Sequence, residues 1–340
     1  MTDVASLSLP ARHVTSGGTR VYTLPVRAFP NFRANTYLLV RGDPHAPAYA
    51  ALVDTGGSGP DNLGDIQAGL AAVRAGYGEA VSLETLTRIV ITHPHPDHLG
   101  GLSALREHTD APVAAFHSAV PFIEEPGAIR AAWLMQPDAQ AAWLGLPPGG
   151  ELDGRIRRRG SNLSVPRAIP VATPLHDGDR LDDLLHVIHT PGHEGHQICL
   201  RVDEVLLSAD HLLPLNSPPL MPARFLRGSG VAAYLDSLDR VEALDGVTLA
   251  LGGHDGPMPD LHARIQALRA RTHEKLDGLL AACTQPMTVH DLLLALHPRL
   301  RSIQAVLLLD QTAALTEYLT GTGALSETAR EDGAGLFTRA

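Results

Sequence analysis

The chain has 340 residues, which corresponds to about two domains, so we expect a large catalytic domain with a smaller appendage. With 37 acidic and 27 basic side chains its formal net charge is −10, which argues against a broad nucleic-acid-binding face or a polybasic membrane anchor. The 18 histidines are the one composition value that points to chemistry, because neutral imidazole is the commonest metal ligand.

The first half of the chain alternates strand and helix patterns. Short apolar runs predict strands at residues 21–26, 36–40 and 49–54. Apolar residues three and four positions apart then predict a helix over 61–76, followed by a strand at 88–92, a helix over 99–107 and a strand at 113–116. This alternation is typical of an α/β fold.

Residues 118–165 lack strand patterns and form an expected insertion, either a lid or a surface excursion. Helical pieces are expected at 129–134 and 139–144, and a Gly/Arg-rich segment, LPPGGELDGRIRRRG, follows them. Strands resume at 184–189, 197–202, 205–208 and 248–251, so the catalytic domain is expected to span residues 1–265.

The remaining residues, 266–340, have the outline of a winged-helix domain. Helices are expected over 260–282, 288–296 and 302–319, the second of them opened by a capping box of Thr288 and Asp291. A hairpin turning at Asp332-Gly333 follows.

The strongest chemical signal is the segment 92–101, THPHPDHLGG, where a predicted strand gives way to a helix. Alternate residues of an extended segment point the same way, so His93 and His95 are expected to converge on one metal ion. Asp97 and His98, at the turn into the helix, are expected to face a second ion. A polar surface loop is the alternative, but a loop gains nothing from three imidazoles and a carboxylate at this spacing.

Three further ligand-type residues each follow a predicted strand. His193 lies in TPGHEGH after the strand at 184–189, Asp210 follows the strand at 205–208, and His254 lies in GGHDG after the strand at 248–251. One such residue at the end of each strand is how an α/β fold assembles a site at the edge of a sheet.

Taken together, THPHPDHLGG, TPGHEGH, SAD and GGH resemble the motifs of the metallo-β-lactamase-fold hydrolases, specifically their glyoxalase-II-like branch, over residues 20–260. The resemblance implies an αββα sandwich with two divalent metal ions, zinc first and iron or manganese as alternatives. It also implies a ligand set: His93, His95 and His193 on one ion, Asp97, His98 and His254 on the other, and Asp210 bridging both.

Three positions compare this chain with sister branches. His95 stands where diiron flavoproteins of the superfamily typically have Glu, which favours a hydrolase over a redox site. True β-lactamases of this fold lack the bridging carboxylate that Asp210 supplies here. Ala209 stands where the glyoxalase-II pattern often has Gly.

The ligand set predicts a hydrolase that uses a metal-bridging hydroxide on a small acyl substrate, a thioester or a lactone. Asp97 and Asp210 are the expected catalytic residues, which orient the hydroxide and carry its proton to the leaving group. Asp54 is the candidate partner of a ligand imidazole, with a turn or capping role as the alternative. Three histidines, His189, His196 and His211, lie next to expected ligands in sequence. They either support a ligand or contact the substrate, or they are ordinary loop histidines.

The insertion and the tail leave a second function open. The tail resembles the winged-helix domain of β-lactamase-like hydrolases that include nucleases and thioesterases, so the alternative is a metal-dependent nuclease acting on single-stranded RNA. However, residues 271–340 hold six basic and eight acidic side chains, a balance of 6 − 8 = −2, which favours a packing or homodimerisation module. A third possibility is a metal-stabilised binding protein without turnover.

The insertion contains one basic cluster, which consists of Arg155, Arg157, Arg158 and Arg159. Together with Arg167 it could bind a phosphate-bearing part of the substrate, or it could form a solvated loop. Trp133, Met135 and Trp143 could line an acyl pocket or form the small core of the insertion. Cys199 and Cys283 are too few for a disulfide framework, and no signal-peptide or membrane-span pattern occurs. We therefore expect a cytoplasmic protein without a membrane partner.

Overall fold

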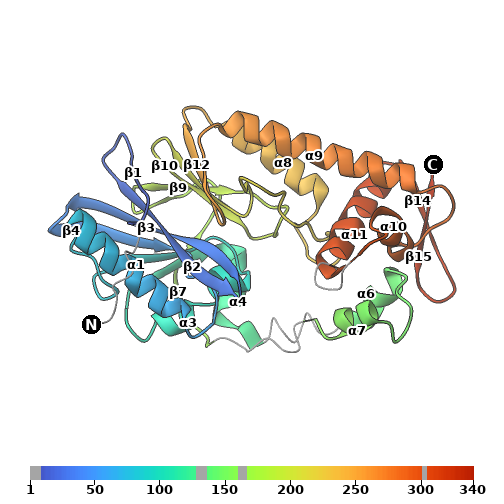
Figure 1. The fold of residues 1–340 in the computed structure, drawn as a ribbon, viewed down its shortest axis with the longest axis horizontal. Coiled ribbons are helices and arrows are strands. Elements are labelled where there is room, and N and C mark those ends of the chain that lie inside the picture. Colours follow the sequence, from blue (N-terminus) through green and yellow to red (C-terminus); the bar gives the residue numbers. More distant parts are fainter. Residues whose placement is uncertain (1–8, 128–135, 160–166, 301–304) are drawn as a thin grey trace.

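The computed structural model describes residues 9–127, 136–159, 167–300 and 305–340. Figure 1 shows two β-sheets at one end of the long axis of the molecule and the C-terminal helices with the insertion at the other end. Helices cover the outer face of each sheet, so the fold is the expected α/β sandwich with αββα layers.

The first sheet has seven strands in sequence order: β1 (Arg12–Val14), β2 (Arg20–Phe29), β3 (Phe32–Asp43), β4 (Ala46–Val53), β5 (Arg88–Ile91), β6 (Val113–Phe116) and β7 (Val171–Leu175). Strands β1 to β4 pair antiparallel, whereas β4 to β7 pair parallel. The carboxyl ends of the parallel strands therefore share one edge of the sheet.

The second sheet has six strands in the order β13-β12-β11-β10-β9-β8: β8 (Arg180–Leu181), β9 (Leu185–His189), β10 (Ile198–Val202), β11 (Val205–Ala209), β12 (Leu249–Gly252) and β13 (Pro257–Met258). Strands β11 and β12 are parallel, and a register irregularity lies between Leu207 and Ala209. Ala209 has a φ of 44°, in the left-handed region that favours glycine, which gives a physical reason for a Gly in the related motif.

The core between the sheets follows from the two-residue period of the strands. Leu39 and Val90 from the first sheet pack in one cluster with Leu200 and Leu207 from the second, and all four are at most 1% exposed. The opposite face of each sheet packs under helices, which buries apolar side chains on both sides of both sheets.

Among the described residues, six helical segments belong to the sandwich: α1 (Asn62–Tyr77), α2 (Pro96–Leu99), α3 (Leu102–Leu105), the 3-10 helix η1 (His117–Ala119), α4 (Val120–Glu124) and α8 (Val231–Glu242). The predicted helix over 99–107 was wrong in extent, because α2 and α3 are separate. The break falls at Gly100-Gly101, where the chain approaches the backbone of residues 55–58 too closely to leave room for a side chain. No helix was predicted at α8.

Two described helices form the insertion, α6 (Pro137–Trp143) and α7 (Glu151–Arg157). The helical piece predicted at 129–134, with Trp133 and Met135, lies outside the described residues. No helix was predicted in the Gly/Arg-rich segment, yet α7 forms there, supported by ion pairs four residues apart, Glu151 with Arg155 and Asp153 with Arg157.

The C-terminal part has the predicted order of three helices and a hairpin: α9 (Leu261–Ala282), α10 (Val289–Leu296), α11 (Ala305–Gly321), β14 (Leu325–Ala329) and β15 (Gly335–Arg339). The capping box of Thr288 and Asp291 is present at α10. Helix α9 runs across the predicted domain boundary at 265, and that division stays a prediction. In the described part of the chain, no helix combines the length and the apolar character that crossing a membrane requires.

Candidate metal centre

Seven ligand-type side chains meet at one edge of the sandwich. His93 and His95 lie in the loop after β5, and Asp97 and His98 lie in the short helix α2 that follows. His193, Asp210 and His254 come from the segments that follow β9, β11 and β12. These are the seven residues singled out from the sequence, and the fold brings all of them together.

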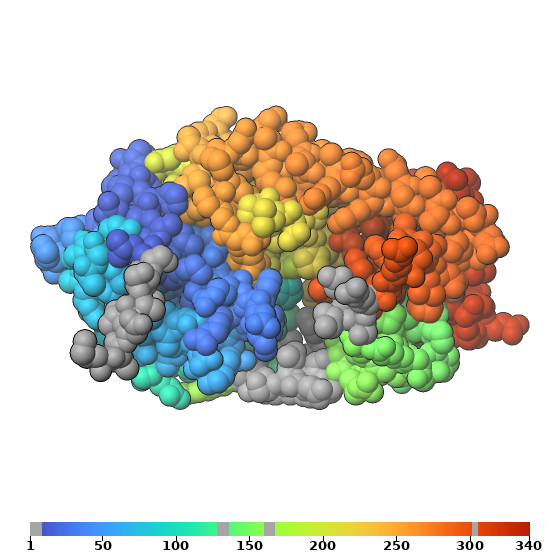
Figure 2. Space-filling model, viewed as in Figure 1, coloured from blue at the N-terminus to red at the C-terminus, as the bar shows by residue number. Residues whose placement is uncertain are grey.

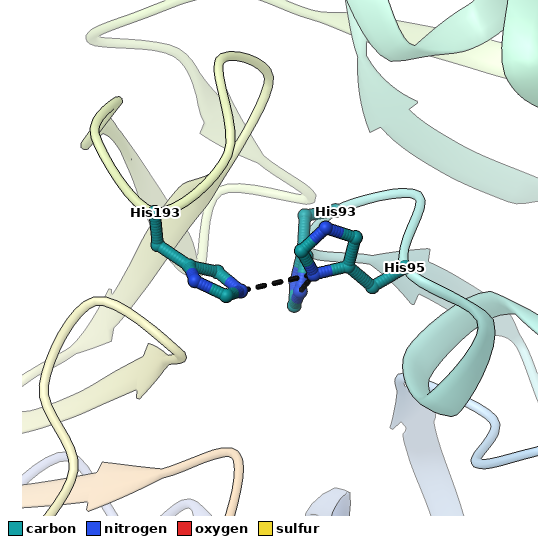
Figure 3. A group of neighbouring side chains, drawn as sticks. All are labelled: His93, His95 and His193. Atoms are coloured by element: carbon teal, nitrogen blue, oxygen red, sulfur yellow. Dashed lines mark hydrogen bonds between the residues drawn. The ribbon is translucent and has the colours of Figure 1, made fainter. Parts of the chain in front are cut away.

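The first group contains three imidazoles. The Nε2 atom of His193 lies 2.9 Å from Nδ1 of His95, and that nitrogen lies 3.1 Å from Nε2 of His93. Figure 3 shows the three rings pointing toward one another, with His193 arriving from the opposite side of the group.

The second group consists of Asp97, His98, Asp210 and His254, and its ligand atoms lie within 4.8 Å of one another. The Nε2 atoms of His98 and His254 both lie 3.4 Å from Oδ1 of Asp210. The other carboxylate oxygen of Asp210, Oδ2, lies 3.5 Å from Nε2 of His193. Asp210 therefore stands between the two groups and presents one oxygen to each.

The three imidazoles of the first group are held neutral. Burial lowers the pKa of His95 to about 3 and moves the pKa of His93 and of His193 in the same direction. At neutral pH each ring therefore presents a lone pair on one nitrogen, which is the form of histidine that binds a metal ion.

The second group has the opposite character. Burial acts to raise the pKa of Asp97, but hydrogen bonding to His254 and the charge of His98 outweigh it and bring that pKa to about 2. Asp210 is likewise held well below its ordinary pKa, mainly by His98 and His254, against burial. Burial would lower the pKa of His254, yet Asp210 and Asp97 raise it to about 10. The two carboxylates thus favour positive charge at this position.

Two observations test whether this donor set fits divalent cations. The Nε2 atom of His98 and Oδ1 of Asp210 are buried without a hydrogen-bond partner among the described residues, which is costly unless another group binds there. Around a tetrahedral zinc ion with Zn–N bonds of about 2.0–2.1 Å, ligand nitrogens lie about 3.3 Å apart, near the distances of 2.9 and 3.1 Å in the first group. Mixed imidazole and carboxylate donors suit zinc, iron and manganese.

Outer hydrogen bonds orient the imidazoles. Nδ1 of His98 donates to Oδ2 of Asp54 at 2.8 Å, the contact expected for Asp54, and the same carboxylate accepts from the backbone N–H of Thr92 at 2.8 Å. Nδ1 of His193 donates to the carbonyl of Pro219 at 2.7 Å, and Nδ1 of His254 donates to the carbonyl of Arg33 at 2.8 Å. Each bond leaves Nε2 directed into the centre.

Two residues that support the segment around His254 were missed from the sequence. The side-chain amide of Asn35 donates to the carbonyls of Gly252 and Asp255 at 3.0 and 2.9 Å, and Tyr37 Oη donates to Gly252 at 2.6 Å. Both residues lie in a strand far from the motif in sequence, and no spacing pattern links them to it.

The three neighbouring histidines have different surroundings. His196 Nδ1 lies 2.8 Å from Oγ of Ser118, and Nε2 of His189 donates to the carbonyl of Gly195 at 2.9 Å, so both stabilise the loop that bears His193. His211 is fully buried, packs against Tyr234, and has no hydrogen-bond partner for either ring nitrogen among the described residues.

Two aromatic residues missed from the sequence border the centre. Phe29 and Phe32 flank the turn between β2 and β3, are 47% and 45% exposed, and stack with ring centroids 6.2 Å apart. The ring of Phe32 lies 4.6 Å from that of His254. Figure 2 shows the blue β2–β3 hairpin bordering a hollow that separates it from the C-terminal helices.

The arginines of the insertion are engaged within the molecule. Arg157 pairs with Asp153 at 2.7 Å and with Asp138, and Arg159 pairs with Asp310 of α11 at 2.8 Å. Arg155 pairs with Glu151 at 2.9 Å, and Arg158 also has an interaction partner. Trp143 packs against Phe225 and Phe337, with ring centroids 5.5 and 5.9 Å apart, so it belongs to a core that joins the insertion to the C-terminal part.

Comparison with known proteins identifies the family of this fold. The model of the metallo-beta-lactamase superfamily matches residues 30–254. A metallo-beta-lactamase family protein from Thermus thermophilus is 29% identical with a TM-score of 0.72, and the match covers 94% of this chain and 98% of that one. A beta-lactamase domain protein from Burkholderia ambifaria shares the fold, with 24% identity, a TM-score of 0.76, and coverage of 98% and 96%. No curated protein gives a significant match. The chain belongs to the metallo-beta-lactamase superfamily and is a metal-dependent hydrolase.

Proposed function

We propose that this enzyme is a dinuclear metal hydrolase of the glyoxalase-II-like branch that acts on small acyl substrates, thioesters or lactones. The observation that carries the proposal is the position of Asp210, with one oxygen toward His193 and the other toward His98 and His254. A carboxylate between two donor groups suits a pair of cations better than a single one.

In this proposal the donor groups divide between two ions. His93, His95 and His193 would hold the first, Asp97, His98 and His254 would hold the second, and Asp210 would contribute to both. Zinc is the first expectation, with iron and manganese as alternatives, because the donor set accepts all three and availability decides among them.

When bound, two divalent ions lower the pKa of water and polarise the substrate carbonyl. Asp97 and Asp210, both ionised, orient the attacking water by accepting hydrogen bonds at their Oδ atoms. In a thioester, the water oxygen bonds to the acyl carbon and the C–S bond breaks. The proton of the water passes through a carboxylate Oδ to the departing sulfur, so the products are a carboxylic acid and a thiol.

The surroundings of the centre favour an acyl substrate. Phe29 and Phe32 form an exposed apolar wall, in which Phe32 packs against His254 and Phe29 against Phe32, and this wall suits the carbon chain of an acyl group. The alternative substrate, single-stranded RNA, would need cationic side chains open to its phosphates, yet Arg157 and Arg159 are paired with carboxylates and the net charge is −10. The tail keeps its predicted winged-helix role as a packing module.

The test is hydrolysis by the metal-loaded enzyme of a panel of thioesters, lactones, phosphodiesters and RNA. We expect activity on thioesters or lactones, and Asp210→Asn should abolish it while thermal unfolding stays cooperative. Asp236→Asn, on the exposed face of α8, is the matched control and should behave as wild type. Activity confined to phosphodiesters, or full activity of Asp210→Asn, would refute the proposal.

A further inference from the structure

A cavity of about 230 Å³ lies where the insertion meets the segment 221–225 of the catalytic part. Gln136, which precedes α6, Pro137 and Gln140 of α6 and Ile156 of α7 line one side, and Met221 and Phe225 line the other. The volume is below the range of about 300–1,000 Å³ typical of sites that enclose a whole drug-sized ligand, so the cavity suits one arm of a molecule.

One wall of the cavity lies two residues along the chain from a residue that bonds to the metal centre. The carbonyl of Pro219 accepts the hydrogen bond from Nδ1 of His193 at 2.7 Å, and Met221, two residues further, lines the cavity. Two residues of extended chain span at most about 7 Å. One wall of the cavity therefore begins within a few ångströms of the residue that orients a candidate metal ligand.

The C-terminal part holds this wall in place. The carboxylate of Glu317 in α11 accepts hydrogen bonds from the backbone N–H groups of Ala223 and Arg224, at 2.6 and 3.1 Å. Glu327 of β14 accepts from Arg224 at 3.2 Å and from Nε1 of Trp143 at 2.7 Å. Glu327 thus binds both the insertion and the segment 221–225, and Glu317 fixes the backbone of that segment.

The two arginines at the cavity are paired with carboxylates. Arg159 pairs with Asp310 through both carboxylate oxygens, and Arg224 pairs with Glu317 and Glu327. Two guanidinium groups therefore face three carboxylates, which disfavours a phosphate or another anion. In contrast, the side-chain amides of Gln136 and Gln140 have no hydrogen-bond partner among the described residues, and Ile156, Met221 and Phe225 supply apolar surface.

We propose that this cavity binds the leaving-group arm of the substrate and selects an uncharged chain that contains an amide. The glutamine amides would donate to and accept from the amide of the arm, and the apolar side chains would pack against its carbon atoms. This inference rests on the proposed acyl hydrolysis, and it gives the C-terminal part a role in substrate selection.

The test compares three thioesters of one acyl group, with N-acetylcysteamine, propanethiol or 2-mercaptoethanesulfonate as the leaving thiol. We expect wild type to have the highest kcat/KM with the N-acetylcysteamine thioester. Gln140→Ala should raise KM for that substrate about tenfold with kcat unchanged, and should change KM for the propanethiol thioester less than twofold. Met221→Ala should raise KM for both the N-acetylcysteamine and the propanethiol thioester, because it removes apolar packing that either carbon chain would make. Gln67→Ala, at an exposed glutamine of α1, is the matched control.

A binding measurement separates this inference from the proposed reaction. Calorimetry with S-methyl-N-acetylcysteamine, a thioether that cannot be hydrolysed, should show saturable binding to wild type and Gln67→Ala and at least tenfold weaker binding to Gln140→Ala. Equal binding to all three proteins, an equal effect of Gln140→Ala on KM for all three thioesters, or a preference of wild type for the sulfonate arm would overturn it. If no thioester is hydrolysed but the thioether binds as predicted, the reaction is wrong and the cavity assignment stands.

Discussion

Gly253 offers a sharp test of the metal centre because it lies directly against two candidate ligands. A Cβ atom added there would lie 2.7 Å from Cε1 of His98 and closer still to Oδ1 of Asp210. Non-bonded carbon atoms pack at about 3.5 Å or more, so His98 must shift by roughly 0.8 Å. Metal–ligand distances tolerate only about 0.2 Å. We therefore expect Gly253→Ala to weaken binding at the second group by at least tenfold.

The assay for Gly253→Ala is elemental analysis of the dialysed protein together with its hydrolytic rate. We expect wild type to retain two ions per chain and the variant about one, with activity reduced by at least tenfold and a stability loss of about 1–3 kcal/mol from overpacking. Gly256→Ala lies in the same GGHDG motif, where an added Cβ meets no atom within 4 Å, and should match wild type. Two retained ions and full activity in Gly253→Ala would refute the reasoning.

Three further changes test separate features. Asp54→Asn removes the anionic partner of His98 and should lower metal affinity or activity by about 10–100-fold in metal titrations; wild-type affinity would contradict its role. Burial acts to raise the pKa of Glu79, but hydrogen bonds from Arg20 and Tyr22 lower it overall. The ionised carboxylate therefore stabilises the fold above the unfolded pKa of about 4.3, and this stabilisation is lost as pH falls through the folded pKa. Glu79→Gln should therefore cost roughly 2 kcal/mol in urea unfolding at pH 7, with the gap to wild type closing in acid; a gap independent of pH would show that the carboxylate charge is not the cause. Thr288→Ala removes the cap of α10 and should cost about 1 kcal/mol in thermal unfolding, whereas an unchanged Tm would show that the cap contributes nothing.

The ligand positions could be predicted from the sequence because each motif directly follows a strand. An apolar strand pattern predicts where the strand ends. Because β11 and β12 are parallel neighbours, the residues that follow them, Asp210 and His254, lie at the same edge of the sheet. The contact of Asp54 with His98 could be anticipated for the same reason, since Asp54 directly follows β4, the parallel neighbour of β5.

Other features depend on contacts between distant segments and have no local signal. The insertion packs against the C-terminal part through pairs such as Arg159 with Asp310, which are 151 residues apart. Phe29 and Phe32 gained a role only through their position beside His254. Helix α8 did have a local signal, with Val231, Tyr234, Leu238 and Val241 buried at helical spacing, and it could have been predicted.

The most direct test of the central claim is a crystal structure of the purified enzyme with diffraction data collected at the absorption edges of zinc, iron and manganese. We predict two anomalous peaks, one among His93, His95 and His193 and one among Asp97, His98 and His254, with the Asp210 carboxylate between them. A single peak, or no peak at these residues in protein that is catalytically active, would contradict a dinuclear centre.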